Sequence, residues 1–208
     1  MTRHLSHAAL TARILALSGQ RVLVAIIGAP GSGKSTLATQ TAEALNRAKP
    51  GTAALLAMDG FHYDDAVLKA RGLDQKKGAP DTFDVAGLYH LLTRLKGNAE
   101  PEVAVPVFDR ALEIARAGAA IIPASTRVVL VEGNYLMLDR APWDRLAPLF
   151  DLTLRLEIPE DELRSRLTRR WENAGLPADE VRRKVEENDL PNGRLIGKDS
   201  LPVDFTLS

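Results

Sequence analysis

The chain alternates between short, continuously apolar runs and longer segments in which apolar residues recur every three to four positions. Uninterrupted hydrophobicity over a short run is typical of strands buried on both faces of a parallel sheet. The apolar runs cover residues 21–27, 52–57, 127–131, 151–158 and 203–207. The pattern therefore predicts a three-layer α/β fold with a mainly parallel sheet and helices on both faces.

The segments between these runs contain the predicted helices and one predicted hairpin. Helical periodicity or capping signals mark residues 3–18, 35–46, 64–70, 85–96, 142–149, 160–173 and 178–188. Two further extended runs, 102–107 and 119–123, predict a small hairpin that stands off the main sheet. The breaker-rich segment 72–84 predicts a solvated connection, and Pro191-Asn192-Gly193 predicts a turn within 188–198.

Length and charge restrict the classes of protein to which the chain can belong. Its 208 residues fit a single domain, residues 1–208. Lys plus Arg and Asp plus Glu both total 27, so the balance argues against nucleic acid or a membrane surface as partner. The absence of cysteine excludes disulfides, thiolate metal sites and a cysteine nucleophile. We expect a cytoplasmic protein with a small-molecule substrate, and a homodimer is compatible with the sequence.

The strongest chemical signal follows the first apolar run. Residues 22–36 read VLVAIIGAPGSGKST, in which Gly28, four intervening residues, Gly33, Lys34 and Ser35 satisfy the pattern G-x-x-x-x-G-K-[ST]. The motif lies between a predicted strand and a predicted helix, as the binding of a nucleotide triphosphate requires. Glycines allow the backbone N–H groups to surround phosphate oxygens at the helix N-terminus.

These features predict ATP and Mg²⁺ as cofactors. Lys34 would place its charge near the β- and γ-phosphates, and the Ser35 hydroxyl would ligate Mg²⁺. The predicted nucleotide-binding residues are Gly28, Ala29, Pro30, Gly31, Ser32, Gly33, Lys34, Ser35 and Thr36.

Two carboxylates follow apolar strands and are expected at the same edge of the sheet as the phosphate loop. Asp59 comes after the run 52–57 and is a candidate general base and a candidate metal ligand. Glu132 comes after the run 127–131 and is the candidate carboxylate that organises Mg²⁺. The alternative for Glu132 is a helix cap or turn.

An arginine-rich region, residues 160–190, is a candidate lid. Arginine suits phosphate clamping and phosphoryl transfer, although a solvated face paired with glutamates is the alternative for about half of these side chains. Arg166 and Arg170 are four residues apart and share a helix face, which Arg164 cannot share fully. We therefore predict that Arg166 and Arg170 point inward. Asn192, in the later predicted turn, is a candidate adenine contact.

An acceptor substrate would lie beside Asp59 and the hairpin. His62, Asp84 and Asp109 are candidate polar contacts, and Phe61 and Phe83 are candidate aromatic contacts. Aromatic residues near a sheet edge are more often part of the core, and His62 can equally be a solvated loop residue. The hairpin, about residues 99–123, is expected to form a wall over the acceptor site.

Several motifs resemble the phosphate-loop small-molecule kinases that include uridine kinase, phosphoribulokinase and bacterial type I pantothenate kinase. In chain order the matches are GAPGSGKST (28–36), MDGFH (58–62), KGAPDTFDV (77–85), PVFD (106–109), LVEGNYLML (130–138) and RSRLTRR (164–170). The second and third motifs, together with the residues that flank them, resemble the bacterial fructose-transport-system kinase subgroup. The resemblance implies Asp59 as base, Ser35 and Glu132 around Mg²⁺, and an arginine of 164–170 as the lid cation.

The resemblance favours an ATP-dependent kinase that phosphorylates a hydroxyl group, with a sugar such as fructose as the expected acceptor. Uridine kinases carry a histidine after the PVYD hairpin, which is absent after Phe108, and pantothenate kinases carry a longer insert. Both departures make those substrates less favoured, but a nucleoside or pantothenate kinase stays an alternative. The other alternative is a regulatory switch that hydrolyses ATP without an acceptor.

Overall fold

A parallel β-sheet forms the centre of the molecule. The computed structural model describes residues 3–4 and 7–208, and within them the sheet has six strands in the order β1-β8-β7-β2-β6-β3, every neighbouring pair parallel. The strands are β1 (Arg3–His4), β2 (Val22–Gly28), β3 (Ala53–Ala57), β6 (Val128–Glu132), β7 (Leu152–Leu156) and β8 (Phe205–Leu207). All seven residues of β2 are buried, as its continuous hydrophobicity predicts.

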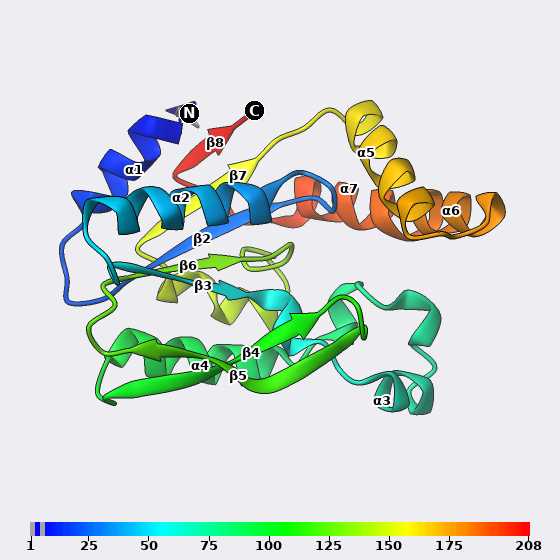
Figure 1. The fold of residues 1–208 in the computed structure, drawn as a ribbon. Coiled ribbons are helices and arrows are strands. Elements are labelled where there is room, and N and C mark those ends of the chain that lie inside the picture. Colours follow the sequence, from blue (N-terminus) through cyan, green and yellow to red (C-terminus); the bar gives the residue numbers. More distant parts are fainter. Residues whose placement is uncertain (1–2, 5–6) are drawn as a thin grey trace.

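Helices cover both faces of this sheet (Figure 1). On one face α1 (His7–Leu15) and α2 (Lys34–Ala48) pack against alternate strand residues such as Val24 and Ile26. On the other face α4 (Val85–Gly97) packs against the intervening residues, such as Ala25 and Ile27, together with the buried Trp143. Since successive strand side chains point to opposite faces, a fully apolar strand requires both layers. The three-layer prediction is confirmed.

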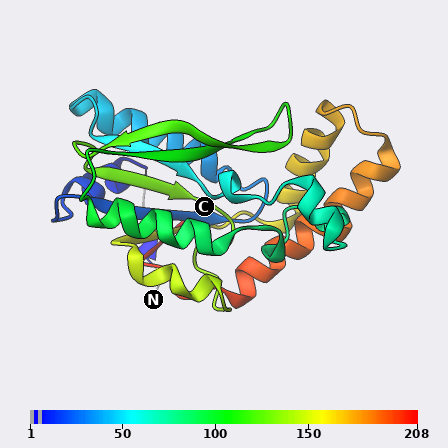
Figure 2. The ribbon, with the colours of Figure 1, turned by 90° about the horizontal axis from the view of Figure 1, so that it is seen from below.

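The hairpin is present and longer than its apolar runs indicate. β4 (Glu102–Asp109) and β5 (Ile114–Pro123) pair antiparallel outside the main sheet. The hairpin crosses the short helical turn η1 (Met58–Phe61) that follows β3 (Figures 1 and 2). The approach is close, because a Cβ added at Gly60 would lie 2.9 Å from the Pro106 carbonyl oxygen. The packing therefore fixes the loop tip of the hairpin near the end of β3.

A helical unit extends beyond the carboxyl ends of the strands (Figure 1). It contains α5 (Glu160–Asn173), α6 (Ala178–Arg183), the π-helical turn η6 (Lys184–Asp189) and α7 (Leu190–Asp199). It has a small core of its own, formed by Leu163, Leu167, Val181, Val185 and Leu190. The bounds predicted for α5 agree with the structure.

The turn predicted within 188–198 is wrong. The chain continues as α7, with Pro191 in its first turn directly after the π-helical segment. Proline disrupts the hydrogen bonding of a regular α-helix, and here it stands directly after the π-helical segment, where the regular pattern is already interrupted. Asn192 consequently lies on a helix and not in a loop.

Two other predicted helices need correction. Within the predicted helix 3–18, Arg3–His4 form a strand beside β8, α1 ends at Leu15, and Leu5 lies outside the described residues. The predicted helix 142–149 consists of two 3₁₀ turns, 143–145 and 147–149, because Pro148, in the interior, lacks the N–H that a continuous α-helix would use there.

The remaining short elements are α3 (Asp65–Ala70) and, in the connection 72–84, two 3₁₀ turns at 74–76 and 80–82. None of the helices formed by the described residues is long and apolar enough to cross a membrane.

Candidate active site

The phosphate loop joins β2 to α2. Gly31 and Gly33 have φ angles of 77° and 93°, which only glycine adopts without strain. Gly33 also occupies the N-cap position of α2, where no side chain caps the helix. The first N–H groups of α2 therefore remain available as donors, an arrangement that suits a phosphate anion. The buried Ser32 Oγ has no partner among the described residues.

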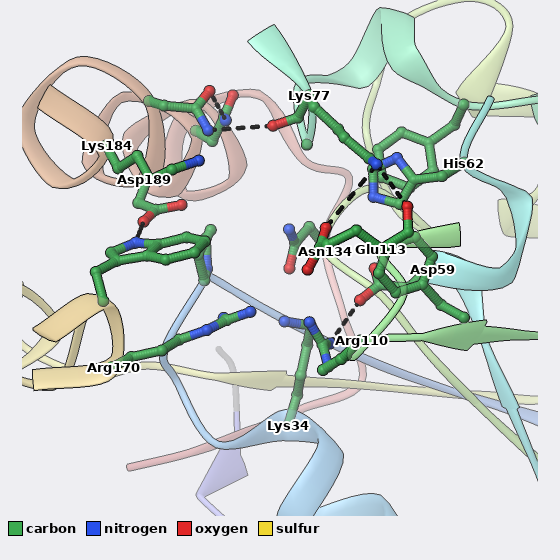
Figure 3. Close-up of a pocket in the computed structure, with 17 residues that line it drawn as sticks. Lys34, Asp59, His62, Lys77, Arg110, Glu113, Asn134, Arg170, Lys184 and Asp189 are labelled. Atoms are coloured by element: carbon green, nitrogen blue, oxygen red, sulfur yellow. Dashed lines mark hydrogen bonds and ion pairs between the residues drawn. The ribbon is translucent and has the colours of Figure 1, made fainter. Parts of the chain in front are cut away.

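A polar cavity of about 130 Å³ opens beside this loop. Its walls come from segments far apart in the chain: the phosphate loop with α2, the η1 turn, the hairpin tip, and the α5–α7 unit (Figure 3). The predicted site residues that line it are Pro30, Lys34, Asp59, His62, Phe83, Arg170 and Asn192. The fold therefore brings these seven predicted side chains together at one cavity.

Asp59 lies in η1, two residues after Ala57, the last residue of β3. Its Oδ2 atom is 2.8 Å from Nη2 of Arg110, which the hairpin tip supplies. The Asp59 side chain is 24% exposed, so the carboxylate is reachable from the cavity. Figure 3 shows Lys34 and Arg170 directed toward the same space.

Glu132 is the last residue of β6 and lies between the phosphate-loop strand and the Asp59 strand. It aligns with Ile26 of β2 and Ala57 of β3. Burial raises the pKa of Glu132, while the positive charge of Lys34 and a hydrogen bond with the Ser35 side chain oppose that shift. The carboxylate is therefore held against the start of α2.

The Ser35 and Glu132 oxygens fit a Mg²⁺ site. Mg²⁺ prefers oxygen ligands and usually takes one or two from the protein, the others coming from phosphates and water. Within the described part of the chain, no group of three or more His, Asp or Glu side chains forms a self-contained metal site. A metal held jointly by nucleotide and protein is consistent with both facts.

The arginines of α5 divide between two directions. Arg166 donates from Nη1 to the Ser32 carbonyl oxygen at 3.2 Å and pairs with Glu162, and Arg170 lines the cavity. Arg164 faces the other way and pairs with Glu160, Asp161 and Glu186. Arg170 thus faces the cavity, and Arg166 contacts the backbone of the phosphate loop without lining the cavity. Their catalytic roles stay predictions.

Three predicted acceptor contacts lie outside the cavity. Phe61 packs against the hydrophobic core. Asp84 caps α4 by accepting from the Gly87 N–H at 2.9 Å, and Asp109 accepts from the Ala111 and Leu112 N–H groups while pairing with Arg116. Aspartates at helix starts and turns bond readily to nearby backbone, and this local chemistry takes up both carboxylates.

His62 and Phe83 form one wall of the cavity. Their rings stack with centroids 3.9 Å apart, and Phe108 of the hairpin lies 5.2 Å from the His62 ring. The pKa of His62 is lowered, chiefly by burial, although the nearby Asp59 charge opposes the shift. The imidazole is therefore neutral near physiological pH.

Several lining residues escaped prediction from the sequence. They are Lys77, Arg110, Glu113, Asn134, Trp171, Lys184, Asn188 and Asp189. Four of them lie in or directly after the quoted motifs, so those motifs were the available signal: Lys77 in KGAPDTFDV, Arg110 after PVFD, Asn134 in LVEGNYLML and Trp171 after RSRLTRR. Asp189 gave no such signal. Trp171 and Asp189 meet because α5 packs against η6, where Trp171 Nε1 donates to Asp189 Oδ2 at 2.7 Å.

A second cavity, of about 450 Å³, lies beside the beginning of the phosphate loop. It is mainly apolar, and its lining includes Ala29, Ile158, Leu163, Gly193 and Ile196. Asn192, the predicted adenine contact, instead lines the polar cavity and donates from Nδ2 to Asn188 Oδ1 at 3.2 Å. The two cavities lie on either side of the loop, one polar and one apolar.

The fold and the site together define the class of P-loop kinases. They combine a phosphate loop at the mouth of a parallel sheet, acidic residues at the ends of neighbouring strands, and a helical unit that carries arginines. Residues 23–189 match the family model described as an AAA domain, and the chain belongs to that family. The protein is a P-loop phosphotransferase, so the group resemblance and the enzyme prediction are confirmed.

Three relatives illustrate this relationship. A candidate uridine kinase of Schizosaccharomyces pombe, C227.14, is 33% identical over 90% of this chain and 83% of its own length. A pantothenate kinase of Paenarthrobacter aurescens is 34% identical over 67% of this chain and 43% of its own length. The crystal structure of a candidate fructose transport system kinase from Silicibacter sp. TM1040 has a TM-score of 0.89 and 43% identity, covering 97% of this chain and 98% of that one.

Proposed function

We propose that this protein transfers the γ-phosphoryl group of ATP to a hydroxyl group of a small metabolite, with a sugar as the expected acceptor. The observation that carries the proposal is the meeting of Lys34, Asp59 and Arg170 at one cavity, although they come from three separate segments. A cation for the phosphates, a proton acceptor and a lid cation are the components that phosphoryl transfer needs.

Each group has a defined part in the reaction. Lys34 and the N–H groups of the phosphate loop bind the phosphates. Ser35 and Glu132 hold Mg²⁺, which when bound neutralises charge on the transferred group. The oxygen of the acceptor hydroxyl bonds to the γ-phosphorus while Asp59 accepts the proton of that hydroxyl. The bond between the γ-phosphorus and the bridging oxygen breaks, and ADP leaves. Arg166 and Arg170 stabilise the charge that develops.

The two cavities divide the substrates between them. The apolar cavity beside Ala29 and Ile158 suits the adenine base, and the polar cavity receives the γ-phosphate and the acceptor. The hairpin, residues 99–123, forms the wall over the acceptor, and residues 160–190 form the lid.

The test measures ADP formation with and without a panel of sugars, nucleosides and pantothenate. Asp59→Asn should lower kcat by roughly 10² to 10⁴ while the KM for ATP stays close to the wild-type value, because only the proton acceptor is lost. Asp81→Asn is the matched control, since Asp81 is an exposed carboxylate paired with Arg140.

The outcomes separate the kinase from the switch. Stimulation of ADP formation by one class of acceptor, lost in Asp59→Asn and kept in Asp81→Asn, supports the kinase. ADP formation that no acceptor stimulates would instead favour an ATP-hydrolysing regulatory switch. An Asp59→Asn enzyme with normal turnover would contradict the role of Asp59.

A further inference from the structure

Lys77 joins three segments of the chain at the edge of the polar cavity. Its Nζ atom donates to Oδ1 of Asp65, in the first turn of α3, at 2.7 Å. The same atom donates to the carbonyl oxygen of Glu113, at the tip of the hairpin, at 2.8 Å, and the Glu113 carboxylate lies 3.9 Å away (Figure 3). A single ammonium group, on a side chain that is 21% exposed, therefore connects the segment 72–84, α3 and the hairpin tip.

The backbone that carries this ammonium group is itself held in place. Asn188 of η6 donates to the Lys77 carbonyl oxygen at 3.3 Å. The next residue, Gly78, donates its N–H to the Thr82 hydroxyl at 3.1 Å. The Gly78 carbonyl oxygen accepts from the hydroxyl of the buried Tyr135 at 2.7 Å. The Lys77 side chain thus extends from a fixed point toward the hairpin.

The hairpin tip, residues 110–113, has no buried residue of its own. All four residues are exposed, and Leu112 is 63% exposed. Among the described residues, the polar contacts of the tip with other elements are those of Arg110 with Asp59 and of Glu113 with Lys77. Since burial of apolar surface does not anchor the tip, these two contacts set its position.

The backbone of Glu113 has a conformation that benefits from the Lys77 contact. Its φ angle is 55°, in the left-handed region that residues other than glycine seldom adopt. A residue held in this region costs free energy and persists where neighbouring contacts offset the cost. The hydrogen bond from Lys77 is made to the carbonyl oxygen of this same residue. It therefore supports the conformation that turns the chain from β4 into β5.

The position of the tip bears directly on the candidate base. Arg110 lies three residues before Glu113 in the same tip, and its Nη2 atom is 2.8 Å from Asp59 Oδ2. Both cations also lie near the Phe108 ring, with Lys77 Nζ 5.6 Å and Arg110 Cζ 5.9 Å from its centroid. A displacement of the tip at Glu113 would carry Arg110 with it, because so little chain separates the two contacts.

We infer that Lys77 is a positioning residue for phosphoryl transfer, which holds the hairpin tip so that Arg110 keeps the Asp59 carboxylate in place. The inference rests on the proposed kinase function and adds a residue that acts through the hairpin tip and not on the reacting atoms. Loss of the ammonium group should therefore disturb the orientation of the base. The contacts of the phosphate loop with the nucleotide should stay unchanged.

The first experiment is a double-mutant cycle that measures acceptor-stimulated ADP formation. Lys77→Met keeps an unbranched side chain but removes the charge, and should lower kcat about tenfold or more while the KM for ATP stays at the wild-type value. The double variant of Lys77→Met with Arg110→Gln should be no more than about threefold slower than Arg110→Gln alone. The two effects should not multiply, because both substitutions release the same carboxylate.

Two further variants separate this role from a general effect of the substitution. Lys77→Arg should recover part of the lost kcat, because a guanidinium can donate to both Asp65 and Glu113. Lys76→Met is the matched control and should retain the wild-type kcat, since Lys76 is the exposed neighbour and lies outside the polar cavity.

The outcomes distinguish this inference from the proposed function. A wild-type kcat in folded Lys77→Met, or effects of Lys77→Met and Arg110→Gln that multiply, would overturn the inference and leave the kinase function intact. ADP formation that no acceptor stimulates in the wild-type enzyme would overturn the proposed function, and with it this role of Lys77.

The second experiment observes the tip without measuring activity. The N–H groups of Ala111 and Leu112 bond to Asp109 within the hairpin, so their hydrogen exchange reports how well the tip is ordered. Exchange at these two amides should be about threefold faster or more in Lys77→Met than in Lys76→Met, with no change in the phosphate loop. Unchanged exchange at the tip would overturn the inference even if kcat falls.

Discussion

The Asp59 carboxylate lies 2.8 Å from the guanidinium of Arg110, a residue 51 positions later in the chain. The contact joins the turn after β3 to the tip of the hairpin. Within the described residues, it is the one side-chain hydrogen bond made by the candidate base. It leaves the second carboxylate oxygen, Oδ1, without a side-chain partner among the described residues, so the hairpin contributes to the position of the candidate base.

Loss of this contact should impair turnover more than stability. We expect Arg110→Gln to lower kcat by about 10- to 100-fold, because misplacement of a catalytic group by about 1 Å can cost that much, while the KM for ATP is kept. Arg116→Gln is the matched control: both arginine side chains are 55% exposed on the hairpin, but Arg116 pairs with Asp109 outside the cavity. Steady-state kinetics measure the difference, and equal kcat values for the two variants would contradict the role of Arg110.

The two faces of α5 should have separable functions. Arg170→Ala removes a cavity-lining cation and is expected to lower kcat on the order of 10³-fold, the scale of an arginine that stabilises phosphoryl-transfer charge. Arg164→Ala removes ion pairs with Glu160 and Glu186 on the opposite side and should retain wild-type kcat. Single-turnover phosphoryl transfer measures both. A wild-type rate in Arg170→Ala would show that the lid cation is another residue.

Gly31 is constrained by conformation and by packing at once. Its φ angle is 77°, and an added Cβ would lie 3.0 Å from Leu167 Cγ, whereas Gly175 has a φ angle of 80° and open space around it. Gly175→Ala therefore measures the backbone strain alone, about 1–2 kcal/mol. Gly31→Ala should cost about 1 kcal/mol more in urea unfolding because of the collision. Only Gly31→Ala should weaken ATP binding, which the fluorescence of Trp171 in the cavity can report.

The link between α5 and α7 should weaken in acid. Hydrogen bonds from Arg194 and Arg164 lower the pKa of Glu160 from its ordinary value of 4.5 to about 2. A carboxyl whose pKa is depressed in the folded state stabilises the protein above the unfolded pKa, and the contribution is lost as the pH falls toward the folded value. Glu160→Gln should therefore lower Tm at pH 7 but have progressively less effect between pH 4.5 and 2.

The matched control for this pH effect is Glu172→Gln, because Glu172 is also on α5 but has no ion pair with another described residue. Its Tm should follow that of the wild type over the same range. A Glu160→Gln effect that stays constant from pH 7 to pH 2 would contradict the ion-pair explanation.

Prediction from local sequence was wrong where a residue type suits more than one structure or role. Pro191-Asn192-Gly193 has turn composition, yet the residues lie in α7, because packing of Val185 and Leu190 against α5 outweighs the local preference. Asp84 and Asp109 have the chemistry of ligand contacts, yet nearby backbone N–H groups bind them. Composition alone could not show which use of a carboxylate prevails.

The sequence by itself determined the parallel sheet, the phosphate loop and the strand-end positions of Asp59 and Glu132, since each follows from periodicity or from neighbours along the chain. Only the tertiary structure decided that Arg110, Lys77 and Asn134 surround the candidate base. Their meeting depends on how the hairpin and the connection after α3 pack against η1. Contacts between residues so far apart in the chain form when elements bury surface against each other. A local sequence pattern predicts the geometry of one strand or turn, but it does not predict which distant element packs against it.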